Sequence, residues 1–443
     1  MRGGEGNNVT ERTRHFQTNF TAMKEPSLLT IEGPSLSPGK VLRRRRIEID
    51  RGTGRILRVT EPEGAAEILL DDHFLVLPGL IDLHVHARED ASGRQSYKED
   101  FSSAGAAAIH GGVTAFADMP NNPFPPVDDG SYLEKRHLAR RAPVDVLLLA
   151  GIGPRTRPLS FPVPYKVFMG PSIGDLYFET ESSLREALGR YRERWVAFHA
   201  EAPEILNRFR DQPTHAERRP PEAESKAVRL ALELARQSSL LAHICHLSTE
   251  AGLEEIRAAR ARGMTVTCEV SPHHLFFDLE DLGRQRRPVF LQCNPPLRPR
   301  SDRLALLEAL RKGEIDCIAS DHAPHSLEEN LKGISGIPHL DTFGPFLTHL
   351  AANGVPWEIL CRAASGAPGR ILTEYLGEPY GAIEEGAVGS LTVLDLSRPL
   401  EVRAAGLRSR AAWSPFEGIT FPGSVSHTIV RGKVHAISNG NGA

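Results

Sequence analysis

The sequence has few cysteines and no long hydrophobic runs. Its 443 residues include five cysteines, which are dispersed and form no CxxC pair. An odd, scattered set indicates free thiols in a reducing compartment and argues against a disulfide-stabilised fold. No apolar run approaches the length of a membrane span, and residues 1–26 lack the apolar segment of a signal peptide. We therefore expect a cytoplasmic protein that does not span a membrane, with a disordered leader at 1–26.

The sequence also lacks a strong excess of charge of either sign. The formal net charge is -3 at pH 7, which does not favour binding to nucleic acid or to an anionic membrane. One basic run, Arg43 to Arg46, lies among strand-like residues and is interpreted as a solvated edge strand. The hydrophobic fraction of 40% is typical of a globular protein. The chain is long enough for one large barrel and a smaller domain.

A repeated pattern occupies the middle of the chain: an apolar β-prone run, a polar turn and then a helical stretch. The runs are FLVLPGLIDLHVH, VTAFADMP, VDVLLLAGI, VPYKVFMG, WVAFHAE, LAHICHLS, MTVTCEVSP and IDCIASDHAP. Continuous apolar runs that alternate with helices predict parallel strands buried on both faces. The pattern predicts an α/β fold, with a (β/α)8 TIM barrel over residues 77–380.

The two ends of the chain have a different pattern. Short β-prone segments broken by glycine and proline fill residues 27–76, and similar segments fill residues 381–443. We expect these two parts to join as one small β-sandwich domain beside the barrel.

Polar side chains gather at the predicted carboxyl ends of the strands, where the active sites of such barrels lie. In HVHAR, strand alternation points His84 and His86 to the same face. Further candidates lie on strands four, five, six and eight, namely Lys166, His199, His246 and Asp321. Each alone fits a structural role, as a snorkelling lysine, a hydrogen-bonded core histidine or a capping aspartate. Their joint placement at one barrel mouth predicts a metal site.

Imidazole and carboxylate donors suit zinc, although manganese, cobalt or iron would accept the same set. Two metals about 3.5 to 4 Å apart that share a hydroxide can polarise a carbonyl and supply the nucleophile. A buried lysine that reacts with carbon dioxide gives a carbamate, which could bridge such a pair. Asp321 could then take the proton of the hydroxide and deliver it to a leaving nitrogen.

HVHAR, the strand-four lysine, HAE, HICHLST and SDHAPH resemble the motifs of the amidohydrolase superfamily, and specifically those of its dihydroorotases. The resemblance extends from about residue 27 to the SPFEG and TIVRGKV segments. It implies reversible hydrolysis of the ring amide of dihydroorotate to N-carbamoyl-aspartate. It also implies two zinc ions, bridged by a carbamylated lysine and a hydroxide. The implied ligands are His84, His86, Lys166, His199, His246 and Asp321.

The same resemblance implies the residues that bind the substrate. Arg88 distinguishes dihydroorotases from similar hydantoinases, and a guanidinium fork suits a substrate carboxylate. Asn121 and His325 are similar to the family's other carboxylate ligands, and Asn294 is similar to a position that contacts the pyrimidine ring. The loop at 332–345 resembles a segment that closes over the substrate. Four other histidines are expected to be structural: His243, His273, His274 and His322.

Two alternative functions stay open at this point. One is another cyclic amidase, such as a hydantoinase or dihydropyrimidinase, and Arg88 argues against it. The other is a non-catalytic dihydroorotase-like subunit that holds aspartate transcarbamoylase together. The presence of all six candidate metal ligands argues against this second alternative. The chain also reads HARED and MPNN where many dihydroorotases read HxHxREPG and MPNT, so the loop that shapes the pocket is altered. We expect a homodimer, and aspartate transcarbamoylase is a possible partner that the sequence leaves open.

Overall fold

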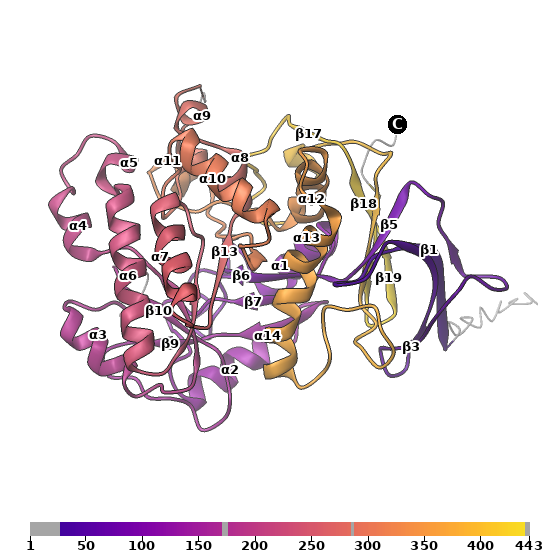
Figure 1. The fold of residues 1–443 in the computed structure, drawn as a ribbon, viewed down its shortest axis with the longest axis horizontal. Coiled ribbons are helices and arrows are strands. Elements are labelled where there is room, and N and C mark those ends of the chain that lie inside the picture. The colour runs from indigo at the N-terminus through magenta and orange to yellow at the C-terminus, as the bar shows by residue number, and fades with distance from the viewer. Residues whose placement is uncertain (1–26, 171–175, 285–287, 439–443) are drawn as a thin grey trace, which may run out of the picture.

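The computed structural model describes residues 27–170, 176–284 and 288–438, so the leader predicted at 1–26 lies outside the described residues. A central part, in which helices surround parallel strands, lies beside a second part made largely of β-strands (Figure 1). Within the described ranges, no helix is both long and apolar enough to cross a membrane.

The central part contains two parallel sheets. Their orders are β14-β13-β12-β11-β10-β9 and β6-β7-β8. The bounds are Leu80–Val85 (β6), Val113–Asp118 (β7), Asp145–Leu148 (β8), Ala150–Ile152 (β9), Tyr165–Phe168 (β10), Trp195–His199 (β11), Leu241–Ile244 (β12), Val266–Val270 (β13) and Cys317–Ile318 (β14). The sheets meet twice, because Leu149 alone separates β8 from β9 and Val85 of β6 forms a parallel bridge with His322 after β14. The predicted α/β class is confirmed.

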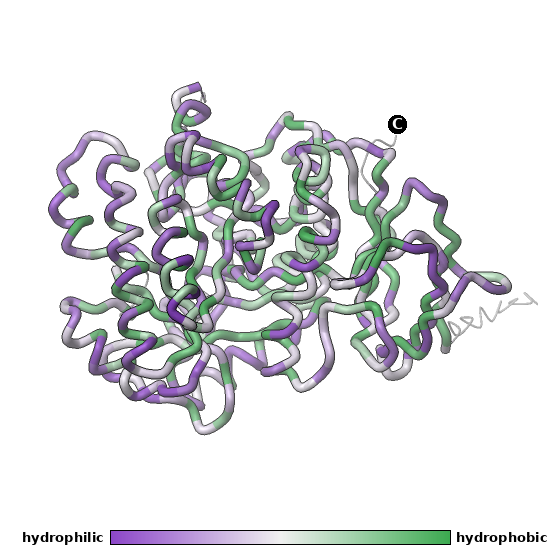
Figure 2. The backbone as a smooth tube through the Cα atoms, in the orientation of Figure 1, coloured by the Kyte–Doolittle hydropathy of each residue, from purple (hydrophilic) through white to green (hydrophobic). Residues whose placement is uncertain are grey.

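Helices cover these strands with their apolar faces. In α6, alanine, valine and leucine side chains three and four residues apart are buried, as an amphipathic helix requires. Hydrophilic residues gather on the outer helices and turns (Figure 2). The α-helices are Phe101–His110 (α1), Asp129–Ala139 (α2), Glu181–Leu188 (α3), Pro203–Arg208 (α4), His215–Arg218 (α5), Pro221–Gln237 (α6), Glu250–Ala261 (α7), Pro272–Phe276 (α8), Leu279–Arg284 (α9), Arg300–Arg311 (α10), Leu327–Leu331 (α11), Phe343–Ala352 (α12), Trp357–Cys361 (α13) and Ala367–Leu376 (α14). Four short helical turns are Pro288–Leu291 (η1), Leu340–Thr342 (η2), Arg362–Gly366 (η3) and Ala404–Gly406 (η4).

Both ends of the chain share one eight-stranded sheet, which we call the terminal sheet. Its strands are Leu28–Ser35 (β1), Arg43–Asp50 (β2), Arg55–Thr60 (β3), Ile68–Leu69 (β4), Phe74–Pro78 (β5), Leu391–Asp395 (β15), Ser424–Val430 (β18) and Lys433–Ala436 (β19). A small hairpin, Leu400–Glu401 (β16) with Thr420–Phe421 (β17), lies apart from it. The ends join as predicted, but through continuous hydrogen bonding, because β5 pairs with both β1 and β15. The topology is therefore one mixed sheet and not two separate sheets of a sandwich.

The interpretation of Arg43 to Arg46 as an edge strand is wrong. These residues begin β2, which pairs with β1 on one side and with β3 on the other. Neighbouring acids balance the arginines, since Arg44 lies 3.3 Å from Glu32 and Arg46 lies 3.1 Å from Glu48. An interior strand tolerates the run because neighbouring carboxylates lie close to the guanidinium groups of Arg44 and Arg46.

Phe416, in the SPFEG segment, packs the C-terminal region onto the central part. Its side chain is fully buried. The ring centroid lies 5.1 Å from that of Phe276, 5.3 Å from that of His339 and 5.2 Å from that of Phe421. This cluster joins α8, the segment before η2 and the β17 hairpin.

Replacing Phe416 with alanine should lower the free energy of unfolding by about 3 to 5 kcal/mol, because the substitution removes the buried ring and leaves a cavity in its place. Phe124→Ala is the matched control, since Phe124 is 46% exposed and should cost less than about 1 kcal/mol. Urea titration followed by circular dichroism measures both. Equal losses in the two variants would contradict the packing role of Phe416.

Candidate functional site

All the predicted site residues except Lys166 line one pocket beyond the carboxyl ends of the parallel strands. They are His84, His86, Arg88, Asn121, His199, His246, Asn294, Asp321 and His325. Lys166, on β10, is fully buried next to the pocket-lining residue Phe168. Residues from six strands or the loops that follow them therefore converge on this pocket.

The first group of donors consists of His84, His86 and Asp321. Oδ1 of Asp321 lies 3.4 Å from Nε2 of His84 and 3.3 Å from Nε2 of His86. Ligand atoms of the three residues lie within 4.8 Å of one another. Two imidazole nitrogens and a carboxylate oxygen at this spacing can hold a divalent metal ion.

The second group consists of His199 and His246, whose facing nitrogens, Nδ1 and Nε2, are 2.9 Å apart. It adjoins the first group, since the rings of His84 and His246 have centroids 5.2 Å apart. Nζ of Lys166 lies 2.8 Å from Sγ of Cys245, the residue before His246. The amine of Lys166 is thus fully buried beside a thiol and adjoins the second group.

The protonation states in the pocket fit metal ligands. Burial lowers the pKa of His86 to about 3 and lowers the pKa values of His199 and His246 as well. Burial acts to raise the pKa of Asp321, but His84 and the hydrogen bond from His86 outweigh it and hold that pKa well below its usual range. His86, His199 and His246 are therefore neutral, with lone pairs available, and the carboxylate of Asp321 is ionised.

Three site residues have left-handed backbone conformations. The φ angles are 61° at Arg88, 31° at His246 and 49° at Asp321. Residues other than glycine pay about 1 to 3 kcal/mol for such conformations, which persist only where the surrounding structure enforces them. The strand ends thus hold these side chains toward the pocket at a cost in stability.

Glu269, on β13, is a site residue that the sequence analysis missed. Its carboxylate contacts Nδ1 of His84, lies 3.0 Å from Nε2 of His243 and accepts a hydrogen bond of 3.1 Å from the backbone N–H of His246. Burial acts to raise its pKa, but the charge of His84 and the hydrogen bond with His243 hold that pKa well below normal. A lone acid inside the apolar run MTVTCEVSP was the available signal, because buried charges are rare unless they are paired.

Glu201 has the corresponding role at His199. Its Oε2 lies 3.0 Å from Nε2 of His199 and also contacts the guanidinium of Arg219. Burial acts to raise the pKa of Glu201, but Arg219 and His199 lower it to about 2. A carboxylate on the far nitrogen fixes the orientation and tautomer of a ligand imidazole, so Glu201 and Glu269 orient one histidine in each group.

Arg88 and His325 lie together at another wall of the pocket, with Nη2 of Arg88 3.1 Å from Nε2 of His325. Nε of Arg88 donates to the carbonyl of Pro324 at 3.3 Å. Behind them, the buried carboxylate of Asp118 accepts from the backbone N–H of Ala87 at 2.8 Å. The guanidinium and the imidazole thus face a shared space that an anion can enter.

The loop predicted to close over the substrate lies against the pocket. Residues 333–336 line it together with Asn294. Gly336 has a φ of 148°, and a Cβ there would lie 2.4 Å from the carbonyl oxygen of Ala323, so only glycine allows this approach. Within the described chain, the four histidines expected to be structural are not part of the pocket wall. His243 instead supports Glu269, and Nδ1 of His322 accepts from the backbone N–H of His339 at 3.0 Å.

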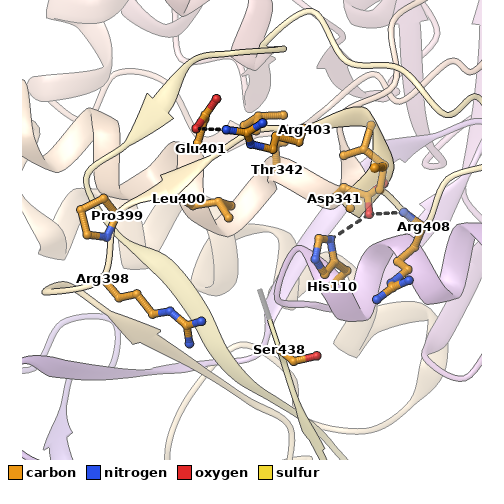
Figure 3. Close-up of a pocket in the computed structure, with 14 residues that line it drawn as sticks. His110, Asp341, Thr342, Arg398, Pro399, Leu400, Glu401, Arg403, Arg408 and Ser438 are labelled. Carbon is orange, nitrogen blue, oxygen red and sulfur yellow. Dashed lines mark hydrogen bonds and ion pairs between the residues drawn. The ribbon is translucent and has the colours of Figure 1, made fainter. Parts of the chain in front are cut away.

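A separate pocket lies between the end of α1, η2 and the segment 398–408 (Figure 3). The carboxylate of Asp341 accepts there from the backbone N–H of Arg408 at 2.8 Å and lies 2.9 Å from Nδ1 of His110. This contact fixes the start of a segment whose Trp413 donates from Nε1 to the carbonyl of His325 at 3.1 Å. The C-terminal region thereby supports the wall that holds Arg88 and His325.

Comparison with known proteins gives consistent relatives. The model of the Amidohydrolase family matches residues 75–435. The dihydroorotase of Pyrococcus furiosus is 34% identical over 390 residues, 88% of each chain. The dihydroorotase of Methanothermobacter thermautotrophicus is 35% identical over 422 residues, 90% of this chain and 93% of the relative.

Solved structures show the same fold. The L-hydantoinase (dihydropyrimidinase) from Arthrobacter aurescens aligns with a TM-score of 0.82 at 24% identity, covering 92% of this chain and 96% of that one. The dihydropyrimidinase from Brevibacillus agri aligns with a TM-score of 0.79 at 20% identity, covering 93% of this chain and 95% of that one.

Glu269→Gln should weaken the binding of divalent metal by about 10- to 100-fold. The substitution replaces the charged carboxylate that accepts from the His84 imidazole with a neutral amide, so the ring is no longer held in its ligand orientation. Glu186→Gln on α3 is the control, since the side chain of Glu186 is 80% exposed and lies outside the pocket wall. Competition with a chromophoric chelator measures the affinity of each folded variant. Unchanged affinity in Glu269→Gln would refute the orienting role.

Proposed function

The chain belongs to the amidohydrolase family, and we propose that it is a dihydroorotase. Its reaction is the reversible hydrolysis of the ring amide of dihydroorotate to N-carbamoyl-aspartate, which is a step of pyrimidine synthesis when it runs toward ring closure. The observation that carries the proposal is the pairing of Arg88 with His325 in the same pocket as the histidine and aspartate donors. The metal donors act on the amide, while the guanidinium of Arg88 and the imidazole of His325 select a ring with a carboxylate.

The proposal includes a (β/α)8 barrel over residues 77–380, flanked by a β domain from residues 27–76 and 381–443. Two junctions between the parallel sheets support the closure of the barrel. At the second junction, the backbone N–H of His86 donates to the carbonyl of His322 at 2.8 Å. Closure explains why His84 and Asp321, far apart in sequence, lie side by side.

We propose two zinc ions for the site. His84, His86 and Asp321 would hold one, His199 and His246 would hold the other, and a carbamate on Lys166 would lie between them. The neutral imidazoles, the ionised carboxylate and the buried amine of Lys166 fit this assignment. When bound, such ions polarise the amide carbonyl and make water nucleophilic at neutral pH.

The residues of the chain position the substrate and move its proton. Arg88, Asn121 and His325 bind the carboxylate, and Asn294 contacts the ring. Asp321, ionised in the pocket, accepts the proton of the attacking water on a carboxylate oxygen and donates it to the ring nitrogen as the amide breaks. The loop at 333–336 excludes water from this step.

The rival enzyme reading is a cyclic amidase for rings without a carboxylate. The likeness to hydantoinases and dihydropyrimidinases, at 24% identity or less, is a likeness of fold alone. A buried guanidinium beside His325 would have no ligand on such a ring, and an unpaired buried cation is costly. A non-catalytic subunit would not need the paired acids that orient His84 and His199. The homodimer, the association with aspartate transcarbamoylase and the cytoplasmic location stay predictions from the sequence.

Arg88→Met should lower kcat/KM for dihydroorotate by about 10- to 100-fold, since charged hydrogen bonds to the carboxylate are lost. Arg94→Met is the matched control, because Arg94 is an exposed arginine of the same loop. Both variants and the native protein are assayed on dihydroorotate and on dihydrouracil, which has no carboxylate. Native protein that prefers dihydrouracil would overturn the proposed substrate.

The carbamate on Lys166 has a direct test. Protein equilibrated with 13C-bicarbonate and zinc should give a carbamate resonance in its 13C NMR spectrum. Lys166→Met, which keeps the length of the side chain, should lack that resonance and should lose at least about 100-fold in kcat together with part of its bound metal. A resonance that persists in Lys166→Met would place the carbamate on another amine.

A further inference from the structure

A buried lysine, Lys98, lies behind His325 on the side opposite Arg88. Its Nζ is 3.2 Å from Nδ1 of His325, whereas Nη2 of Arg88 is 3.1 Å from Nε2 of the same ring. The exposed fraction of Lys98 is only 7%. Lys98 precedes α1, outside the pocket wall, and the motifs of the sequence analysis do not include it.

The imidazole of His325 therefore lies between two groups that can only donate hydrogen bonds. An ammonium and a guanidinium have no acceptor, and a neutral imidazole has one N–H and one lone pair. Burial and the charges of Arg88 and Lys98 keep the pKa of His325 far below its ordinary value, so the ring is neutral. One ring nitrogen can accept from its neighbour, while the other directs an N–H at a second donor.

Glu329, through its contact with Lys98, favours one of the two tautomers. The carboxylate of Glu329 lies 2.8 Å from Nζ of Lys98 and accepts from the Tyr97 hydroxyl at 2.7 Å, so it holds the ammonium in place. It lies 3.6 Å from Nδ1 of His325, beyond hydrogen-bond distance. The ammonium of Lys98, which has no acceptor to offer, thus favours Nδ1 as an acceptor and the ring proton on Nε2.

In that tautomer, Nε2 of His325 and Nη2 of Arg88, 3.1 Å apart at the pocket wall, are two donors that meet without an acceptor between them. Two converging donors of this kind are satisfied by an anion with two lone-pair oxygens. A carboxylate that lies in the pocket in front of both nitrogens can accept from each of them. The mismatch in the protein alone becomes a matched pair when the substrate is bound.

We propose that Lys98 is a positioning residue that fixes His325 as the Nε2–H tautomer and thereby creates the second donor of the carboxylate site. The proposal rests on the proposed function in one respect, since it takes the ligand to be a ring carboxylate. Trp413 completes the arrangement, because its indole N–H holds the backbone carbonyl of His325 at 3.1 Å. The ring is thus held at its backbone and at Nδ1, with Nε2 left for the ligand.

Kinetics separate this role from a purely structural one. Lys98→Met keeps most of the length of the side chain and removes the donor. We expect KM for dihydroorotate to rise about tenfold while kcat changes less than about threefold, because the clamp acts on binding and not on the amide. Lys312→Met removes an exposed lysine from the end of α10 and should leave both constants unchanged. A loss of about tenfold in the kcat of Lys98→Met, with KM unchanged, would overturn the proposal.

The tautomer is measured on the native protein without any substrate. In 15N-histidine-labelled protein, the ring resonances of His325, assigned by their absence in His325→Gln, should show a protonated Nε2 and an unprotonated Nδ1. A protonated Nδ1 would overturn the proposal even if Lys98→Met fails to fold. Because this spectrum is recorded without dihydroorotate, its result does not depend on whether the proposed substrate is correct. A correct tautomer in a protein that ignores dihydroorotate would therefore refute the proposed function and leave the role of Lys98 standing.

Discussion

The buried negative charge of Glu269 is the constraint on which the site depends. Removing a carboxylate from water costs several kcal/mol, and the cost is recovered only if each lone pair finds a donor. Those donors come from β6, from β12 and from the backbone that follows β12. One charge therefore fixes the relative positions of strands that belong to both parallel sheets. One of the histidines that it holds, His84, lies 3.4 Å from Asp321.

The parallel strands could be predicted because they are buried on both faces. Such strands have continuous apolar sequences, and each predicted run contains one or two of the strands in the structure. The terminal sheet was less predictable, because its pairing joins residues from opposite ends of the chain. The local sequence of Arg43 to Arg46 does not show that β3 pairs with β2 or that Glu32 and Glu48 neutralise the arginines.

In the candidate site, too, some residues could be predicted from the local sequence and others could not. Residues that face the pocket could be identified because strand alternation and strand ends determine their direction, as for His84 and His86. Residues that hold them from behind depend on contacts between distant segments, so Lys98 and Glu201 were missed. The interpretation of His243 as a packing residue was right about its direction, but its contact with Glu269 could not be inferred, since that partner lies on another strand.

The contact between Trp413 and the carbonyl of His325 has a consequence for the order of events during synthesis. The two residues are 88 positions apart, and Trp413 is translated after His325. The metal donors and Arg88 are all translated earlier, so a nascent chain can assemble them first. The wall that holds His325 gains its contact with Trp413 only after that residue has emerged, so this wall is completed later than the metal donors can be.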